Sequence, residues 1–522
     1  MENGVKANSD PLSLVNGAPT GSKSNWVVQK FGGTSIGKFC SNIIDHVILP
    51  SLADHNVAVV CSARSSSTKA EGTTNRLLRA ARDAENPHSL HYTSFVEAVR
   101  LEHIQVAEGE VKSPQLRDQL VTDINGECER VLKVLEAAQT LGEISARCVD
   151  KVISAGEKLS CRVMATFLQD RGVPAEYVDL ADIIDFAIGA YGLDQRFYDR
   201  FANVLGERIG PCVGKVPVVT GYFGTIPGGL LDQVGRGYTD LCAALVAVGI
   251  RAKELQVWKE VDGIFTADPR KVPTARLLPA ITPAEAAELT FYGSEVIHPF
   301  TMEQVIRAKI PIRIKNVMNP RGDGTVIFPD STAELERTPG HDPRLFRTRS
   351  PSLRQKPKRP TAVTIKHKIL VINVHSNKRS LSHGFFAGIF SVLDRWRLSI
   401  DLISTSEVHV SMALHSEVPL LNGCRDEYQI IDDDLKGALS DLQRYGTVDI
   451  IPDMAILSLV GKQMKNMIGV AGRMFTTLGE NNVNIEMISQ GASEINISCV
   501  IEEKDADRAL NIIHTTMFTF LD

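Results

Sequence analysis

The first residues that could do chemistry lie in a glycine-rich segment near the N-terminus. Lys30 ends a short apolar run, and Gly32 and Gly33 follow it. A lysine ammonium attracts phosphate oxygens, and glycines let backbone N–H groups approach them just before a helix. The spacing from Gly32 to Lys38 is that of a P-loop, but Phe39 stands where a P-loop has Ser or Thr. We therefore expect a phosphate-binding turn of another kind, and the alternative is an ordinary βα turn.

Other polar residues follow later apolar runs in the same way. Ser62 comes after the second run, and Thr74 opens a helical pattern, where its hydroxyl could bind a carboxylate or cap the helix. Glu157 lies beside a glycine and could hold an ammonium or face solvent. Arg236, between two glycines, resembles an anion clamp, and Asp240 could cap a helix or position a metal or an ammonium. Together these types favour binding of a small, charged substrate next to phosphate.

The elements that must position these residues are strands alternating with helices. Short apolar runs at Trp26–Val28, Val57–Cys61 and Val216–Thr220 read as buried strands, and long helical patterns cover about 91–138 and 240–249. This alternation predicts an α/β domain over 26–330 with a mainly parallel sheet. Ligands of such sheets bind at the C-terminal ends of the strands, where the polar residues fall.

Composition sets the limits of the whole chain. The 522 residues are 43% hydrophobic and 23% charged, which excludes a disordered or fibrous protein and predicts two to four domains. With 57 Lys and Arg against 62 Asp and Glu, the net charge is -5, so neither nucleic acid nor membrane is an expected partner. The nine cysteines form no C-x-x-C pair, and residues 1–25 read as a disordered leader without a signal peptide. We expect a cytoplasmic protein that binds small molecules.

One segment departs from this even charge. Residues 337–359 contain eight basic residues, one acid and four prolines. Such a composition cannot bury a core, so we expect an exposed linker over 331–360 between two domains. A docking strip for an acidic partner is the alternative.

Beyond the linker the sequence repeats itself at an offset of 85 residues, with Ile372 aligned to Leu457. Each copy reads as strand, glycine-containing turn, helix, strand and strand, a small α+β unit. We expect one unit over 361–449 and a second over 450–522, with strand 362–366 able to pair with the second.

Motifs along the whole chain resemble those of a known family. They are Lys30-Phe31-Gly32-Gly33-Thr34-Ser35, Gly235-Arg236-Gly237-Tyr238-Thr239-Asp240, the stretch Trp258 to Arg270, and Tyr292-Gly293-Ser294-Glu295-Val296-Ile297-His298-Pro299. In this order they are similar to the aspartokinases of the amino acid kinase family, and the stretch Cys61 to Asn75 resembles the monofunctional fungal form. The resemblance implies a three-layer α/β kinase domain followed by two ferredoxin-like ACT domains.

It also implies an activity, the Mg²⁺-dependent transfer of the ATP γ-phosphoryl group to the β-carboxylate of L-aspartate. The product, 4-phospho-L-aspartate, leads to threonine, methionine and in many organisms lysine. Two alternatives stay open: a catalytically silent amino-acid sensor, and a kinase of another acid such as N-acetylglutamate.

By position in the motifs, the resemblance assigns roles to individual residues. The catalytic residues would be Lys30 and Asp240. The ATP-binding residues would be Lys30, Gly32, Gly33, Thr34, Ser35, Ser62, Lys259, Glu260, Phe265 and Arg270. The aspartate-binding residues would be Ser62, Thr74, Glu157, Tyr222 and Arg236. No residue is assigned to a resident metal. Bacterial relatives commonly have other residues at Lys259, Glu260 and Glu295.

Regulation is the last implication of the resemblance. Aspartokinases carry the ACT pair as a feedback sensor, so an amino-acid effector, threonine by similarity to fungal enzymes, is expected, together with a homo-oligomer formed through these domains. The expected pocket lies where a strand end meets a helix N-terminus suited to a carboxylate. Its residues would be Asn373, Ser376, Ser382, His383, Gly384 and Phe385.

Overall fold

The structure is a computed structural model that describes residues 25–65, 71–186, 188, 193–224, 226–293, 297–328, 359–376, 384–416, 420–424, 427–462, 464–491 and 495–519. The predicted leader up to residue 24 and most of the predicted linker, 331–358, lie outside these residues. No helix in the described part of the chain is both long enough and apolar enough to cross a membrane.

Eight strands form the sheet of the N-terminal domain, in the order β3-β4-β2-β1-β5-β7-β8-β6. Their bounds are β1 Trp26–Phe31, β2 Asn56–Cys61, β3 Ala175–Val178, β4 Val216–Thr220, β5 Glu254–Lys259, β6 Ala280–Ile281, β7 Ile312–Asn316 and β8 Thr325–Ile327. Neighbours pair in parallel except β7 with β8. The expected mainly parallel sheet is therefore confirmed.

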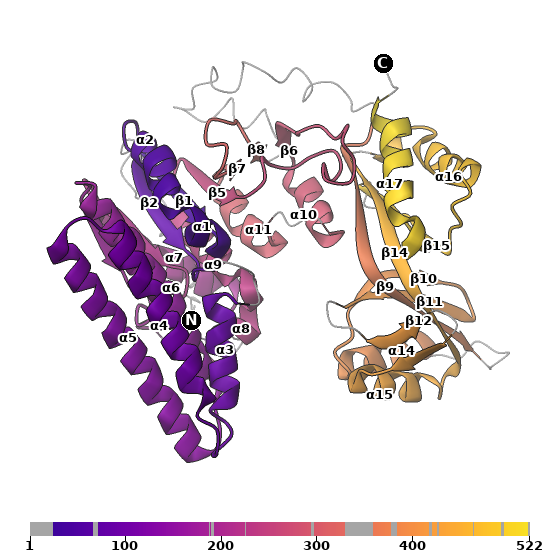
Figure 1. The fold of residues 1–522 in the computed structure, drawn as a ribbon. Coiled ribbons are helices and arrows are strands. Elements are labelled where there is room, and N and C mark those ends of the chain that lie inside the picture. The colour runs from indigo at the N-terminus through magenta and orange to yellow at the C-terminus, as the bar shows by residue number, and fades with distance from the viewer. Residues whose placement is uncertain are drawn as a thin grey trace, which may run out of the picture.

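Helices cover both faces of this sheet, as Figure 1 shows, because its strands are apolar on both sides. Side chains along β2 alternate, with Val57 and Val59 in one core and Ala58 and Val60 in the other. The first core contains residues of α1 Gly33–Ile43, η2 Ile44–Ile48, α3 Thr73–Asp83, α4 His91–Glu110, α5 Pro114–Leu141 and α6 Ala146–Asp170. The second contains residues of α7 Gln195–Ile209, α8 Leu230–Val234, α9 Tyr238–Gly249, α10 Pro283–Phe291 and α11 Pro299–Arg307.

Local signals fix several helix ends. Ser145 and Asp194 accept N-cap hydrogen bonds at the starts of α6 and α7. Thr282 and Glu285 form a capping box at α10, and α5 ends at Gly142 in the left-handed conformation. The remaining short elements of the domain are α2 Leu49–Ser51, η3 Gly210–Cys212 and η4 Gly235–Gly237.

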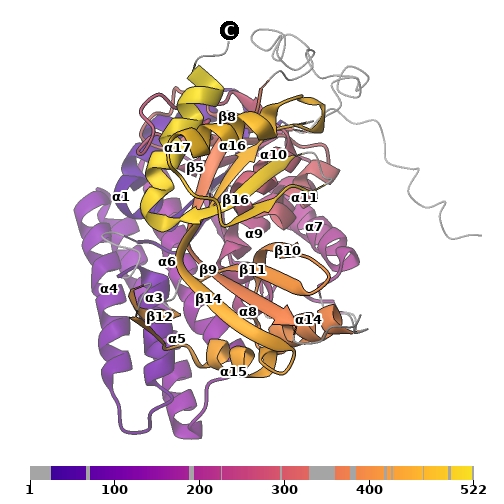
Figure 2. The same ribbon diagram turned by 90° about the vertical axis from the view of Figure 1, so that its right-hand side faces the viewer.

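A six-stranded antiparallel sheet dominates the C-terminal region, in the order β10-β11-β9-β14-β16-β15 (Figure 2). Its strands are β9 Ala362–Ser376, β10 Ile400–Thr405, β11 His409–His415, β14 Gly446–Val460, β15 Met487–Ser489 and β16 Asn496–Glu502. Its helices are α14 Phe385–Arg395, α15 Asp433–Leu442, α16 Val470–Glu480 and α17 Ala506–His514. Smaller elements are β12 Leu421–Cys424, β13 Glu427–Ile430, η6 Met464–Asn466, η7 Glu503–Asp505 and η8 Thr515–Thr519.

The 85-residue repeat is visible in the backbone. Helices α14 and α16 begin and end at positions 85 residues apart. Left-handed residues occur in pairs at the same offset: Lys368 with Asp453, Gly384 with Gly469, and Arg397 with Asn482. Both units therefore use the same chain path.

The two units share their central strands. The 15-residue strands β9 and β14 pair along their lengths, and the first half of β9 lies beside Leu457–Val460. The expected boundary at 449 falls inside β14, so the division into 361–449 and 450–522 stays a prediction. In β9, odd-numbered residues such as Val363 face the helical core before Lys368, and even-numbered ones such as Ile372 face it afterwards. The left-handed Lys368 produces this change of alternation.

Candidate active site

The C-terminal ends of four adjacent parallel strands lie side by side. Cys61 at the end of β2 is in register with both Phe31 and Thr220, and Phe31 is in register with Trp258. The loops that follow β1, β2, β4 and β5 therefore emerge at one edge of the sheet. This is the edge at which the sequence predicted a ligand site.

Lys30 and Asp240 meet at this edge. The Nζ of Lys30 lies 2.8 Å from Oδ1 of Asp240, and the two side chains are 11% and 20% exposed. Asp240 stands in the first turn of α9, whose N-cap is Gly237 without a side-chain capping bond. Asp240 therefore pairs with the lysine and is not the helix cap.

The glycines after Lys30 have different structural roles. A Cβ added to Gly33 would lie 2.1 Å from the carbonyl oxygen of Ala63, whereas one added to Gly32 would meet nothing within 4 Å. The carbonyl of Gly33 also accepts a hydrogen bond from the N–H of Ser65 at 2.9 Å. The loops after β1 and β2 thus touch, and only glycine fits at position 33.

A hydroxyl and a carboxylate join this turn to the end of β5. Ser35 Oγ donates to Glu260 Oε1 at 2.7 Å. Glu260 follows Lys259, the last residue of β5. Glu260 thus lies next to the turn that Ser35 belongs to. Thr34 is half-buried in the first turn of α1.

Glu157 is buried in the middle of α6, at 1% exposure. The backbone N–H of Tyr222 donates to one carboxyl oxygen and Thr239 Oγ1 donates to the other at 2.8 Å. Burial raises the pKa of Glu157 to about 7, although these hydrogen bonds and the nearby Lys30 lower it. The carboxyl is thus poised to change charge near neutral pH.

Ser62 directly follows β2, and Thr74 stands in the first turn of α3. The N–H of Ser62 donates to the carbonyl of Phe31 at 3.1 Å, which extends the pairing of β1 with β2. The N-cap of α3 is Gly72 without a side-chain capping bond. The capping role considered for Thr74 is therefore not the one it has here.

The remaining predicted substrate residues are less fully placed. Arg236 lies in the short helix η4 between the two glycines, and its side chain is outside the described part of the structure, as is Glu295. Phe265 bridges to Leu277 in a loop after β5. The guanidinium of Arg270 pairs with Asp268 at 2.8 Å and is 86% exposed.

The predicted effector residues that the structure describes lie on β9 and at the start of α14. Asn373 pairs in register with Ser411 and Asp449. Gly384 is the left-handed N-cap of α14. Phe385 is buried in the core of the first unit. Ser376 is the last residue of β9, and Ser382 and His383 lie outside the described residues.

Sequence reasoning missed the role of Thr239. It stands inside the Gly235–Asp240 motif, but its hydroxyl faces Glu157 from another helix. Its place inside the motif is the one local signal, because neighbouring residues of a helix point in different directions and adjacency to Asp240 does not show which way Thr239 faces.

Comparison with known proteins identifies the family. The sequence matches the amino acid kinase family over residues 25–316 and an ACT domain over 457–517. The aspartokinase of Saccharomyces cerevisiae is 55% identical over 511 residues, covering 96% of this chain and 94% of the relative. The chain belongs to the aspartokinases. The aspartokinase of Schizosaccharomyces pombe is 53% identical over 505 residues, covering 96% of this chain and 95% of that relative.

Solved aspartokinases share the fold over nearly the whole chain. E. coli aspartokinase III with aspartate and ADP is 26% identical, with a TM-score of 0.69 over 94% of this chain and 99% of that one. The same enzyme with lysine and aspartate has a TM-score of 0.72 at 26% identity, over 95% and 100% of the two chains. Together with the relatives above, these matches confirm the expected fold and an aspartate kinase.

Proposed function

We propose that the cluster around Lys30 carries out phosphoryl transfer from ATP to the β-carboxylate of L-aspartate. The observation that carries this proposal is the Lys30–Asp240 pair at 2.8 Å, at the edge of the sheet where the loops converge. The pair fixes a lysine ammonium where phosphate oxygens would approach the N–H groups of Gly32 and Gly33.

The reaction requires few functional groups from the protein. The attacking β-carboxylate is already ionised at neutral pH, so no strong base is required. Catalysis then consists of aligning two anions and neutralising the charge that develops between them. Lys30 supplies positive charge at the transferring group, and Asp240 holds the ammonium in place.

Aspartate would be held by groups of both signs. Arg236 would bind its α-carboxylate and Glu157 its ammonium, with Ser62, Thr74 and Tyr222 around them. Glu157 is already oriented by Thr239 and by the N–H of Tyr222. An ionised Glu157 beside an ammonium would gain the counter-charge that burial otherwise denies it.

ATP would lie across Thr34, Ser35, Lys259, Glu260, Phe265 and Arg270. Mg²⁺ prefers oxygen ligands and is usually shared with substrate phosphates. Asp240 is the carboxylate beside Lys30 that offers such oxygen. When bound, the ion would neutralise phosphate charge.

A hydroxamate assay, which traps acyl phosphates, tests the site. Purified Lys30→Met should lose at least about a hundredfold in turnover, since removal of a single transition-state donor typically has this effect. Lys38→Met changes an exposed lysine of α1, the helix that follows β1, and should keep normal turnover. Equal activities for the two variants would refute the assignment.

We further propose feedback inhibition by an amino acid bound near Asn373, Ser376 and Gly384, with threonine as the effector. The support is the resemblance to fungal aspartokinases and the duplicated fold. A relative, E. coli aspartokinase III, has been solved with lysine. The product would feed threonine and methionine synthesis in the cytoplasm, and the ACT pair would form a homo-oligomer.

Inhibition assays with threonine, lysine and methionine identify the effector. Asn373→Ala should weaken inhibition while leaving uninhibited turnover nearly unchanged, because the residue lies on β9 in the C-terminal sheet and not in the loops around Lys30. If it lowers turnover equally with and without effector, the residue is structural.

A further inference from the structure

One loop of the kinase domain belongs structurally to the C-terminal unit. The loop from Phe265 to Leu277 lies between β5 and β6 in sequence. Its residues Ala267 and Val272 are buried in the same apolar core as strands β9, β14 and β16 and helices α16 and α17. The N–H of Val363 in β9 also donates to the carbonyl of Thr266 at 2.8 Å.

Polar contacts reinforce this attachment on the side of α17. The buried His514 contacts Thr266 Oγ1 through Nε2 at 2.9 Å and Thr274 Oγ1 through Nδ1 at 3.3 Å. Arg276 donates to the carbonyl of Phe518 at 3.0 Å. The loop therefore has to follow any displacement of α17 and β9.

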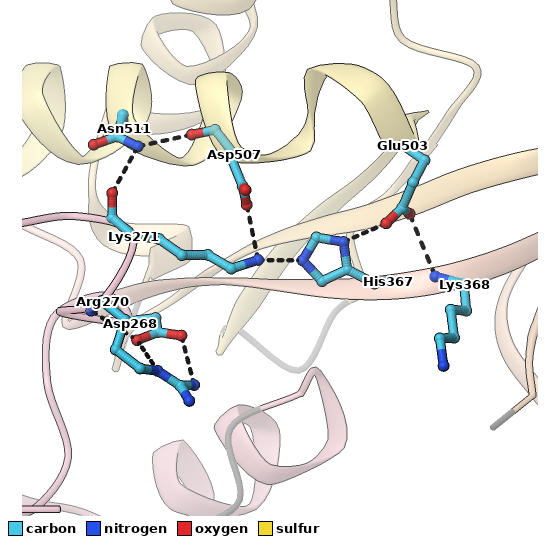
Figure 3. A network of polar contacts seen from close by, with 8 residues as sticks. All are labelled: Asp268, Arg270, Lys271, His367, Lys368, Glu503, Asp507 and Asn511. Atoms are coloured by element: carbon cyan, nitrogen blue, oxygen red, sulfur yellow. Dashed lines mark hydrogen bonds and ion pairs between the residues drawn. The ribbon is translucent and has the colours of Figure 1, made fainter.

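Lys271 joins the loop to two elements of the C-terminal unit (Figure 3). Its Nζ lies 2.8 Å from Oδ1 of Asp507 and 2.5 Å from Nε2 of His367. The carbonyl of Lys271 accepts a hydrogen bond from Asn511 at 3.0 Å. On the far side of the imidazole ring, Nδ1 lies 2.5 Å from Oε1 of Glu503. One lysine thus reaches both α17 and β9.

The hydrogen-bond chain has a fixed direction. An ammonium can only donate, so Nε2 of His367 must accept, and Nδ1–H then donates to Glu503. His367 immediately precedes Lys368, the left-handed residue at which β9 passes from one unit to the other. The hydrogen bonds from Lys271 through His367 to Glu503 therefore lie next to the point where the two units are joined.

We propose that Lys271 is a positioning residue for ATP. Through its contacts, a change in the six-stranded C-terminal sheet is transmitted to the loop that binds the nucleotide. Lys271 fixes the loop that carries Phe265 and Arg270, so a change in β9 alters how these residues meet the nucleotide. The inference rests on the proposed nucleotide role of the loop. An effector can shift ATP affinity only by its own difference in affinity between two arrangements, and this contact supplies the link.

Steady-state kinetics on the full chain test this inference. Lys271→Met removes the ammonium but keeps most of the stem, and Lys271→Arg keeps the charge. Lys271→Met should raise KM for ATP about three- to tenfold, leave KM for aspartate within twofold, and weaken inhibition by the effector amino acid, while Lys271→Arg restores part of each. The matched control is Lys368→Met, because the Lys368 side chain is exposed and points away from the network.

The outcomes separate the two proposals. If Lys271→Met matches the Lys368→Met control, or raises KM for both substrates equally, the positioning role is wrong. If Arg270→Ala leaves KM for ATP unchanged, the nucleotide role of the loop is wrong. Should Lys271→Met not fold, Asp507→Asn removes the partner on α17 from an exposed position and should show the same split in KM.

Discussion

At the scale of single residues, the buried Glu157 links the fold to the reaction. Its carboxyl is held between a backbone N–H and the Thr239 hydroxyl, and burial raises its pKa to about 7. A group in this state is neutral below pH 7 and negatively charged above it. The charge that would bind the ammonium of aspartate is therefore lost progressively as the pH falls through about 7.

This predicts a pH dependence for aspartate. Below pH 7, kcat/KM for aspartate should fall by up to about tenfold per pH unit as Glu157 becomes protonated, and above it the profile should level off. Thr239→Val removes a hydrogen bond that favours the charged form, so the inflection should move to higher pH. Initial rates between pH 5.5 and 8.5 measure both profiles. An inflection that does not move in Thr239→Val would exclude Glu157 as its source.

Two neighbouring glycines give a second prediction at this scale. Gly33→Ala should destabilise the protein by about 1–3 kcal/mol or more, because its Cβ would lie 2.1 Å from a backbone oxygen that cannot easily yield. Gly32→Ala should change stability much less, since φ there is -75° and the space is open. Thermal unfolding of both variants checks this. Equal shifts in Tm would mean that the loops after β1 and β2 do not touch in solution.

At the scale of elements, close helix packing depends on glycine in one place and not in another. A Cβ on Gly206 of α7 would lie 2.4 Å from the carbonyl oxygen of Gly249 at the end of α9. Gly109 of α4 is exposed and has nothing within 4 Å. Helix α7 therefore requires glycine at position 206, whereas α4 does not require it at position 109.

The two variants Gly206→Ala and Gly109→Ala should change the stability of the protein in opposite directions. Gly206→Ala should lower stability, because overpacking costs about 1–3 kcal/mol. Gly109→Ala should raise it by about 0.5–1 kcal/mol, since alanine has the better helix propensity. Denaturant unfolding of both variants decides the matter, and a stabilising Gly206→Ala would show that α7 and α9 pack less closely than described.

Elements also show how far the sequence could be interpreted. The alternation of strands and helices was sufficient for the parallel sheet, and the repeat at 85 residues predicted α14 and α16, because local patterns determine both. The packing of Ala267 and Val272 into the C-terminal unit has no local signal, since a short apolar residue in a loop looks the same whichever core receives it. Likewise, Lys271 has no motif that points to His367.

At the scale of the molecule, the long strands β9 and β14 make the two C-terminal units one structure. Ile372 and Leu457, 85 residues apart, are both fully buried on the helical side of the sheet. Because the strands run through both units, a substitution that destabilises one unit should also destabilise the other.

Ile372→Ala and Leu457→Ala test this coupling. Each substitution should lower the free energy of unfolding by about 2–5 kcal/mol. Each should also reduce amide protection in both α14 and α16 when hydrogen exchange is followed by mass spectrometry. Loss of protection confined to the helix of the mutated unit would mean that the units unfold separately.

The two copies of the repeat have unequal neighbours. The core of the second copy includes residues of the kinase loop, whereas the core of the first, in the described part of the chain, is built from residues between Leu370 and Ile450. On the opposite face of the sheet, Tyr292 of the kinase domain packs against Val371 and Leu402 of the first copy. The helical core of the first copy is thus the part that includes no kinase residue in the described part of the chain. Substitutions that retune effector choice should therefore accumulate in the first copy, and the second should tolerate few changes where it meets the loop.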